Sequence, residues 1–117
     1  MRSERRVVVT GMGLVSPVGN DLTTAWDNIT NGRSGIQDLT AFDVSGFASR
    51  IGGEVREFDP NDYMAPKEVR KYDPFIHYGV AAAVQAMQDS GLEITEENAP
   101  RVGCMVGAGI GLSLIHI

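Results

Sequence analysis

The strongest helical periodicity along the chain follows Asp73 and Pro74. Apolar side chains recur there at intervals that place them on one helical face: Ile76, Val80, Ala83, Val84 and Met87. An aspartate before a proline is a typical helix start, because the carboxylate can cap the first turn and proline fits the first helical position. Gly91 offers the left-handed conformation that ends many helices. The pattern predicts an amphipathic helix that begins at Pro74 and ends before Gly91.

A second helix is predicted nearer the start of the chain. Its apolar positions also follow the helical repeat: Leu22, Ala25, Trp26 and Ile29. Asn20 or Asp21 can cap the start of this helix, and Gly32 suits its end.

Two apolar runs predict strands that are covered on both faces. Residues 6–10 contain three consecutive valines, and residues 101–106 place Val102, Cys104 and Val106 on one face. Such runs are typical of a parallel sheet buried between helices. We therefore expect both segments in the core, with Cys104 as an inert core thiol.

The middle of the chain has weaker signals. Residues 33–50 show no sustained period and are predicted to be mostly loop, and residues 51–55 form a weaker strand interrupted by two glycines. Asp59-Pro60 and Pro66 each favour a short helical turn. The resulting order of strands and helices indicates a layered α/β fold.

Composition limits the function classes. With 117 residues, 43% of them hydrophobic, and a mean hydropathy of -0.07, the chain has the composition of one soluble globular domain with a single core. Its net charge of -5 disfavours the broad basic surface that nucleic-acid binding needs. The longest weakly polar stretch, residues 79–84, is too short to span a membrane, and the start of the chain lacks the apolar region of a signal peptide. With Cys104 as the single cysteine, we expect a cytoplasmic protein without disulfide, metal or cofactor.

One glycine motif invites a nucleotide-binding hypothesis. Gly11 and Gly13 follow a predicted strand, as in the dinucleotide fingerprint, but Ser16 stands where that fingerprint has its third glycine and Pro17 comes next. The following helix also begins too late to direct its first amides at a phosphate. A structural turn is the preferred interpretation, and a nucleotide-binding oxidoreductase is the alternative from another functional class.

No residue is a convincing catalytic nucleophile. A reactive thiolate needs a neighbouring imidazole or a helix N-terminus, and Cys104 on a strand and His77 on a helix offer neither. Lys67, Arg70 and Lys71 form a more specific pattern, since their spacing places them on one face of a helical turn. They are either a local basic site on an acidic protein or simply a solvated face.

Three blocks in order carry a family resemblance: RRVVVTGMGLVSPVGN at residues 5–20, KEVRKYDPFIHYGVAAAVQAMQDSGLEITEENAPRVG at residues 67–103, and GAGIG at residues 107–111. Together they resemble the bacterial β-ketoacyl-acyl carrier protein synthases, most closely type II. The resemblance implies a thiolase-like fold, with two related α/β halves in an αβαβα arrangement, and a homodimer. Residues 1–111 would then be only the first part of the N-terminal half.

The resemblance also implies an activity and a partner. Family members are acyltransferases of fatty-acid synthesis that condense an acyl group, held on a cysteine, with malonyl-acyl carrier protein and release carbon dioxide. The family's cysteine and two histidines would lie beyond the end of this sequence. We therefore expect the 117-residue chain alone to be inactive. No catalytic role is carried onto Cys104, His77 or His116.

Two features transfer by position. Lys67, Arg70 and Lys71 match the family's basic patch for acyl carrier protein, and Ile110 matches the residue at the far end of the acyl pocket. A chain-length-factor-like or polyketide ketosynthase subunit without catalytic activity is the alternative within the same fold. Residues 112–117, LSLIHI, resemble a translated sequencing adapter, so we expect them to be a non-native tail.

Overall fold

The computed structural model describes residues 4–111, and its central element is the helix α3, Pro74–Ser90. The helix begins and ends where the sequence predicts. Gly91 closes it in the left-handed conformation, with φ of 66°, and the Gly91 N–H donates to the Gln88 carbonyl. Asp73 makes no capping hydrogen bond with its side chain, so Pro74 and the helix's own packing set the start.

The predicted first helix is confirmed as α1, Leu22–Thr30. Asp21 is its N-cap, since its carboxylate accepts a hydrogen bond of 2.8 Å from the Thr24 N–H. Gly32 follows the C-cap with φ of 66°, which confirms it as the stop. Of the predicted apolar face, Ala25 is buried, whereas Trp26 and Ile29 are exposed.

The predicted loop at 33–50 contains a short strand that the sequence did not signal. β1, Ile36–Asp38, pairs antiparallel with β2, Ile51–Gly53, and Ile36 lies opposite Gly53. Gly53 is needed there because a Cβ at this position would lie 2.9 Å from the Pro17 ring. Short helical turns form as predicted, the 3-10 turn η1 at Pro60–Asp62 and the helix α2 at Pro66–Lys71, and a further 3-10 turn, η2, lies at Ala99–Arg101.

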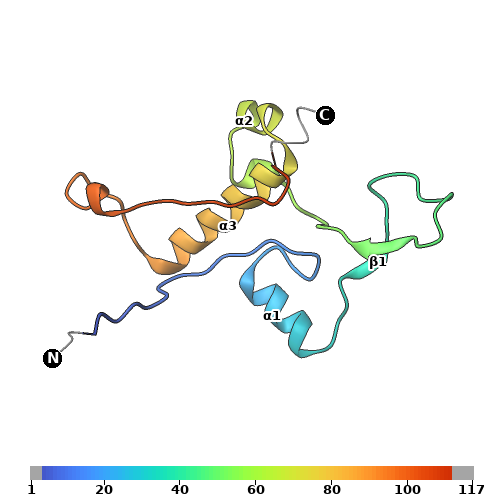
Figure 1. Cartoon of the computed structure of the whole chain (residues 1–117), viewed down its shortest axis with the longest axis horizontal. Coiled ribbons are helices and arrows are strands. Elements are labelled where there is room, and N and C mark those ends of the chain that lie inside the picture. Colours follow the sequence, from blue (N-terminus) through green and yellow to red (C-terminus); the bar gives the residue numbers. More distant parts are fainter. Residues whose placement is uncertain (1–3, 112–117) are drawn as a thin grey trace.

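Gly11 and Gly13 let the N-terminal segment lie directly on α3. A Cβ on Gly13 would sit 2.2 Å from the Ala82 carbonyl oxygen, and one on Gly11 would sit 2.3 Å from that of Ala86. Helix side chains also bind this segment: Asp89 accepts from the Met12 N–H at 2.9 Å, and Gln85 accepts from the Leu14 N–H at 3.2 Å. Figure 1 shows the segment coming in from the N-terminal side, passing along α3 and continuing into the loop before α1.

The two predicted buried strands do not form. Residues 6–10 and 102–106 form no strand within the described chain, and Arg101 belongs to η2. Val7 is 93% exposed, and Cys104 is exposed. A valine run specifies an extended backbone, but a strand also needs a neighbouring strand to satisfy its N–H and C=O groups. Within residues 4–111 the sheet has two strands, β1 and β2, so neither run has a partner. The prediction that Cys104 is a buried thiol is wrong for this structure.

The described residues form a mixed helical structure with a small sheet and little core. Ala25 and Ala81 are the buried apolar side chains among residues 4–111, and several large apolar side chains are exposed. The radius of gyration is 17.9 Å, whereas a compact domain of this length has about 13 Å. No helix among the described residues is long and apolar enough to cross a membrane. The layered α/β sheet predicted from the element order is not assembled in this part of the chain.

Candidate functional site

The helix α2 carries the predicted basic face. Pro66 begins it, Glu68 lies in its first turn, and Arg70 and Lys71 lie in its last turn. This order of charges suits the helix dipole, which favours anions at the N-terminus and cations at the C-terminus. Figure 1 shows α2 beside the start of α3, on the outside of the molecule.

The three basic side chains are all exposed on α2: Lys67, Arg70 and Lys71. The ion pairs within residues 4–111 are Arg33 with Asp27 and Arg56 with Glu54, so none of the three is neutralised by a described acidic side chain. The Lys71 ammonium lies 5.3 Å from the centre of the Tyr72 ring, a cation–π distance that orients it. The structure therefore brings these residues together as a small, exposed positive surface, as their spacing predicts.

Ile110 lies in a turn at the end of the described chain. It is 64% exposed. Gly111 next to it has φ of 44°, and a Cβ on Gly111 would lie 3.1 Å from Ala108 and 3.4 Å from the Phe75 ring at the start of α3. The turn is thus held against α3 at Gly111 and presents Ile110 outward.

Cys104 and His77 do not form a nucleophile and base. His77 is buried on α3 and its Nε2 lies 3.0 Å from the Val69 carbonyl oxygen, while Cys104 is exposed on the extended segment after η2. Among residues 4–111 no cluster of three or more His, Cys, Asp or Glu side chains is arranged to hold a metal ion.

The geometry of the glycine motif contradicts pyrophosphate binding. The space over Gly11 and Gly13 is filled by the backbone of α3, as the positions of the Ala82 and Ala86 carbonyls show. Ser16 and Gly19 close a tight turn through two backbone hydrogen bonds of 2.9 and 3.1 Å. The glycines serve helix packing, and the tight turn expected at them lies instead at residues 16–19.

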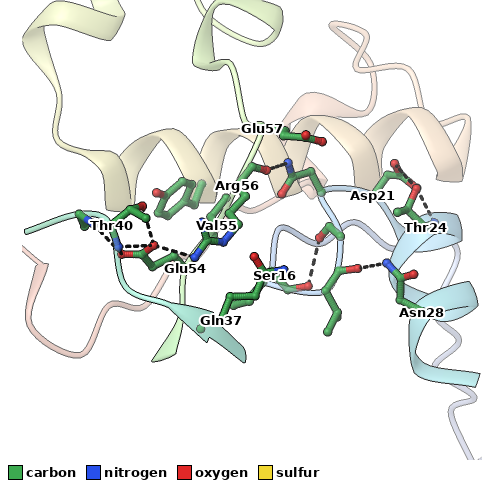
Figure 2. Close-up of a pocket in the computed structure, with 17 residues that line it drawn as sticks. Ser16, Asp21, Thr24, Asn28, Gln37, Thr40, Glu54, Val55, Arg56 and Glu57 are labelled. Atoms are coloured by element: carbon green, nitrogen blue, oxygen red, sulfur yellow. Dashed lines mark hydrogen bonds and ion pairs between the residues drawn. The ribbon is translucent and has the colours of Figure 1, made fainter. Parts of the chain in front are cut away.

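Sequence reasoning missed an open cleft of about 1160 Å³ between the N-terminal loop, α1 and the β1–β2 hairpin. Figure 2 shows its polar lining. The Asn20 amide donates to the Arg56 carbonyl at 2.7 Å. Glu54 accepts from the N–H groups of Thr40 and Ala41 and pairs with Arg56 at 3.1 Å.

These contacts hold the hairpin loop to its strands. The Ala41 N–H is the main reason that the pKa of the Glu54 carboxyl lies below its ordinary value, so this carboxylate is ionised at neutral pH. A polar run that follows a glycine-interrupted strand is the feature of the sequence that could have indicated this cleft. The polar groups of the cleft chiefly bind one another, and their hydrogen bonds join the N-terminal loop to the hairpin.

Comparison with known proteins identifies the family. Residues 4–115 match the family described as "Beta-ketoacyl synthase, N-terminal domain". The 3-oxoacyl-[acyl-carrier-protein] synthase 2 of Vibrio harveyi is 55% identical over 115 residues, which are 97% of this chain and 28% of the relative. The enzyme of the same name from Staphylococcus aureus strain COL is 40% identical over 111 residues, or 95% of this chain and 27% of the relative.

A solved structure agrees with these matches. The ishigamide ketosynthase/chain length factor superposes with a TM-score of 0.72 and 34% sequence identity, covering 82% of this chain and 23% of that one. The chain thus spans about a quarter of the length of the proteins it matches. The fold of the family is thiolase-like, whereas the described residues alone form helices with a two-stranded sheet. By this match of residues 4–115 to the family's N-terminal domain, the chain belongs to the β-ketoacyl synthase family.

Proposed function

We propose that this chain is the amino-terminal part of a 3-oxoacyl-acyl carrier protein synthase II, which condenses an enzyme-bound acyl group with malonyl-acyl carrier protein. The support is the family match together with the printed names of relatives that are 40–55% identical. In this proposal the nucleophile and histidines come from sequence outside the chain, and the working enzyme is a cytoplasmic homodimer. We call that whole protein the complete synthase.

The basic surface of α2 is proposed as the docking site for acyl carrier protein. The observation that carries this proposal is the exposure of Lys67, Arg70 and Lys71 on one short helix of a chain whose net charge is -5. A local positive surface on an acidic protein attracts an acidic partner at one place and repels it elsewhere. The family resemblance implies that the carrier protein presents an acidic helix to this surface, so the charges are complementary.

Ile110 is proposed as a wall of the acyl pocket. An exposed branched side chain between two glycines is consistent with a wall that another part of the complete synthase covers. The proposal assigns no role in bond making to this residue. The boundary drawn at residue 111 is also still a prediction, because residues 112–117 lie outside those that the structure describes.

A non-catalytic subunit of the chain-length-factor type is the second candidate. The structural match to a ketosynthase/chain length factor favours it. The two candidates differ in whether the complete protein carries a cysteine that an acyl group can load. Incubation with carrier protein that holds an acyl thioester, followed by intact-mass measurement, distinguishes them, since the acyl group is transferred to a cysteine of the condensing enzyme alone and the carrier thiol is released.

Charge reversal tests the docking proposal. In the complete synthase, Arg70→Glu combined with Lys71→Glu is expected to raise KM for acyl carrier protein substrates about tenfold, because each exposed pair contributes up to about 1 kcal/mol and 1.4 kcal/mol is tenfold. Turnover of a short pantetheine thioester, which lacks the acidic protein, is expected to stay unchanged. Steady-state kinetics at several salt concentrations measure both, and the salt dependence of the carrier reaction should flatten.

Arg5→Glu with Arg6→Glu is the matched control. It changes the net charge equally, and both residues are exposed on the segment that leads away from α2 in Figure 1. If the control pair raises KM as much as the α2 pair, the effect is one of total charge and the docking proposal fails. It fails equally if both thioester substrates lose the same activity in the α2 variant.

A further inference from the structure

His77 connects the basic helix to the centre of the molecule. Its side chain is 9% exposed and comes from the first turns of α3, and its Nε2 lies 3.0 Å from the carbonyl oxygen of Val69. Val69 lies on α2 between the basic residues Lys67 and Arg70. This side chain therefore contacts the backbone of the helix whose surface is charged.

The chemistry of the contact decides which ring nitrogen is the donor. A carbonyl oxygen accepts hydrogen bonds and cannot donate, so Nε2 of His77 carries the proton. The last carbonyls of a helix lack partners inside it, and in α2 the Glu68 carbonyl receives the Tyr72 N–H. His77 supplies the donor that the Val69 carbonyl needs.

α2 has few other restraints. It has six residues, which is too short to be stable by itself, and its N-cap Ala65 has no side chain that could bind the first amides. Its placement therefore depends on contacts with the rest of the chain. Among residues 4–111, His77 is the residue outside α2 whose side chain makes a hydrogen bond to the α2 backbone. Loss of this bond leaves a partly buried carbonyl unsatisfied and favours a shifted helix.

We propose that His77 is a positioning residue for carrier-protein docking: its Nε2–H holds α2 so that Lys67, Arg70 and Lys71 keep one orientation. This inference rests on the proposed docking function of α2. His77 touches neither substrate nor reacting atoms, and it acts through the helix. Several weak ion pairs form at the same time only when one helix holds their side chains in a fixed orientation. The orientation of α2 therefore affects carrier-protein binding and leaves the condensation reaction unchanged.

Three substitutions at one position separate the hydrogen bond from packing. His77→Gln places an amide Nε2–H the same number of bonds from Cβ as the ring Nε2, so it can replace the donor. His77→Asn has the same amide but is one bond shorter, and His77→Leu keeps apolar bulk without a donor. In the complete synthase we expect His77→Leu and His77→Asn to raise KM for acyl carrier protein substrates about fivefold, with turnover of the short pantetheine thioester unchanged, and His77→Gln to stay near the parent enzyme.

Amide hydrogen exchange over residues 66–72 of the complete synthase gives the second readout. Exchange there should accelerate in the Leu and Asn variants and recover in the Gln variant, because the donor restrains the helix. The inference is overturned if His77→Leu changes neither exchange nor KM, if exchange rises without a change in KM, or if His77→Gln behaves like His77→Leu. If one of these outcomes occurs while Arg70→Glu with Lys71→Glu still raises KM, the docking function stands and the positioning role of His77 alone is wrong. If that double variant also leaves KM unchanged, the docking function itself fails.

Discussion

Ile110→Phe is expected to remove the elongation of long acyl chains by the complete synthase while short primers still react. A phenyl ring at the end of the proposed pocket occupies the volume that the last methylenes of a long chain need, and each excluded methylene costs about 1 to 3 kcal/mol. We therefore expect kcat/KM for long acyl primers to fall about 100-fold or more. The turn cannot yield easily, because Gly111 has φ of 44° and lies against Ala108 and Phe75.

The measurement is kcat/KM across a series of primers of increasing length. Ile110→Val is the control, since it keeps a branched apolar side chain of smaller size and should extend the accepted length slightly or leave it unchanged. An equal loss for short and long primers in Ile110→Phe would show a general packing defect and contradict the pocket assignment.

Gly13→Ala is expected to destabilise the complete synthase by about 3 kcal/mol. The added Cβ would sit 2.2 Å from the Ala82 carbonyl oxygen and 2.8 Å from the Ala86 nitrogen. Both are backbone atoms inside α3, so relief requires moving the N-terminal segment away from the helix. That movement would also break the hydrogen bond between the Leu14 N–H and Gln85.

Gly46→Ala is the matched control for this prediction. A Cβ on Gly46 would have no other atom of the described chain within 4 Å, and Gly46 has no positive φ. The same substitution there should therefore change stability by less than about 0.5 kcal/mol. Urea unfolding of both variants, followed by circular dichroism, gives the comparison. Equal midpoints for Gly13→Ala and the parent protein would show that the close contact with α3 is absent in the complete synthase.

Local signals predicted the helices well. The start and end of α3 follow from Pro74 and Gly91, and those of α1 follow from Asp21 and Gly32, because capping and breaking depend on the residues at the helix ends themselves. The basic surface of α2 was predictable for the same reason: a spacing of three and four residues places side chains on one face of any helix.

The strands were less predictable. The weaker strand expected at residues 51–55 is confirmed as β2, but the two stronger signals did not give strands. The valines of residues 6–10 favour an extended backbone, but pairing requires a second strand brought from elsewhere in the chain. β1 shows the converse, because three residues with a weak pattern became a strand when β2 supplied its partner. The exposure of Cys104 follows from the same dependence, since a residue on an unpaired and uncovered segment is not buried whatever its neighbours in sequence.

The sequence by itself thus determined where the helices begin and end, which three cations share a face, and, through several ordered blocks, the family. Only the tertiary structure decided that Gly11 and Gly13 are packing positions, and that His77 donates to the carbonyl of Val69. The physical reason is the range of each interaction. Caps and helical faces involve residues within one or two turns, whereas strand pairing, burial and a hydrogen bond between two helices depend on distances that only the folded chain sets.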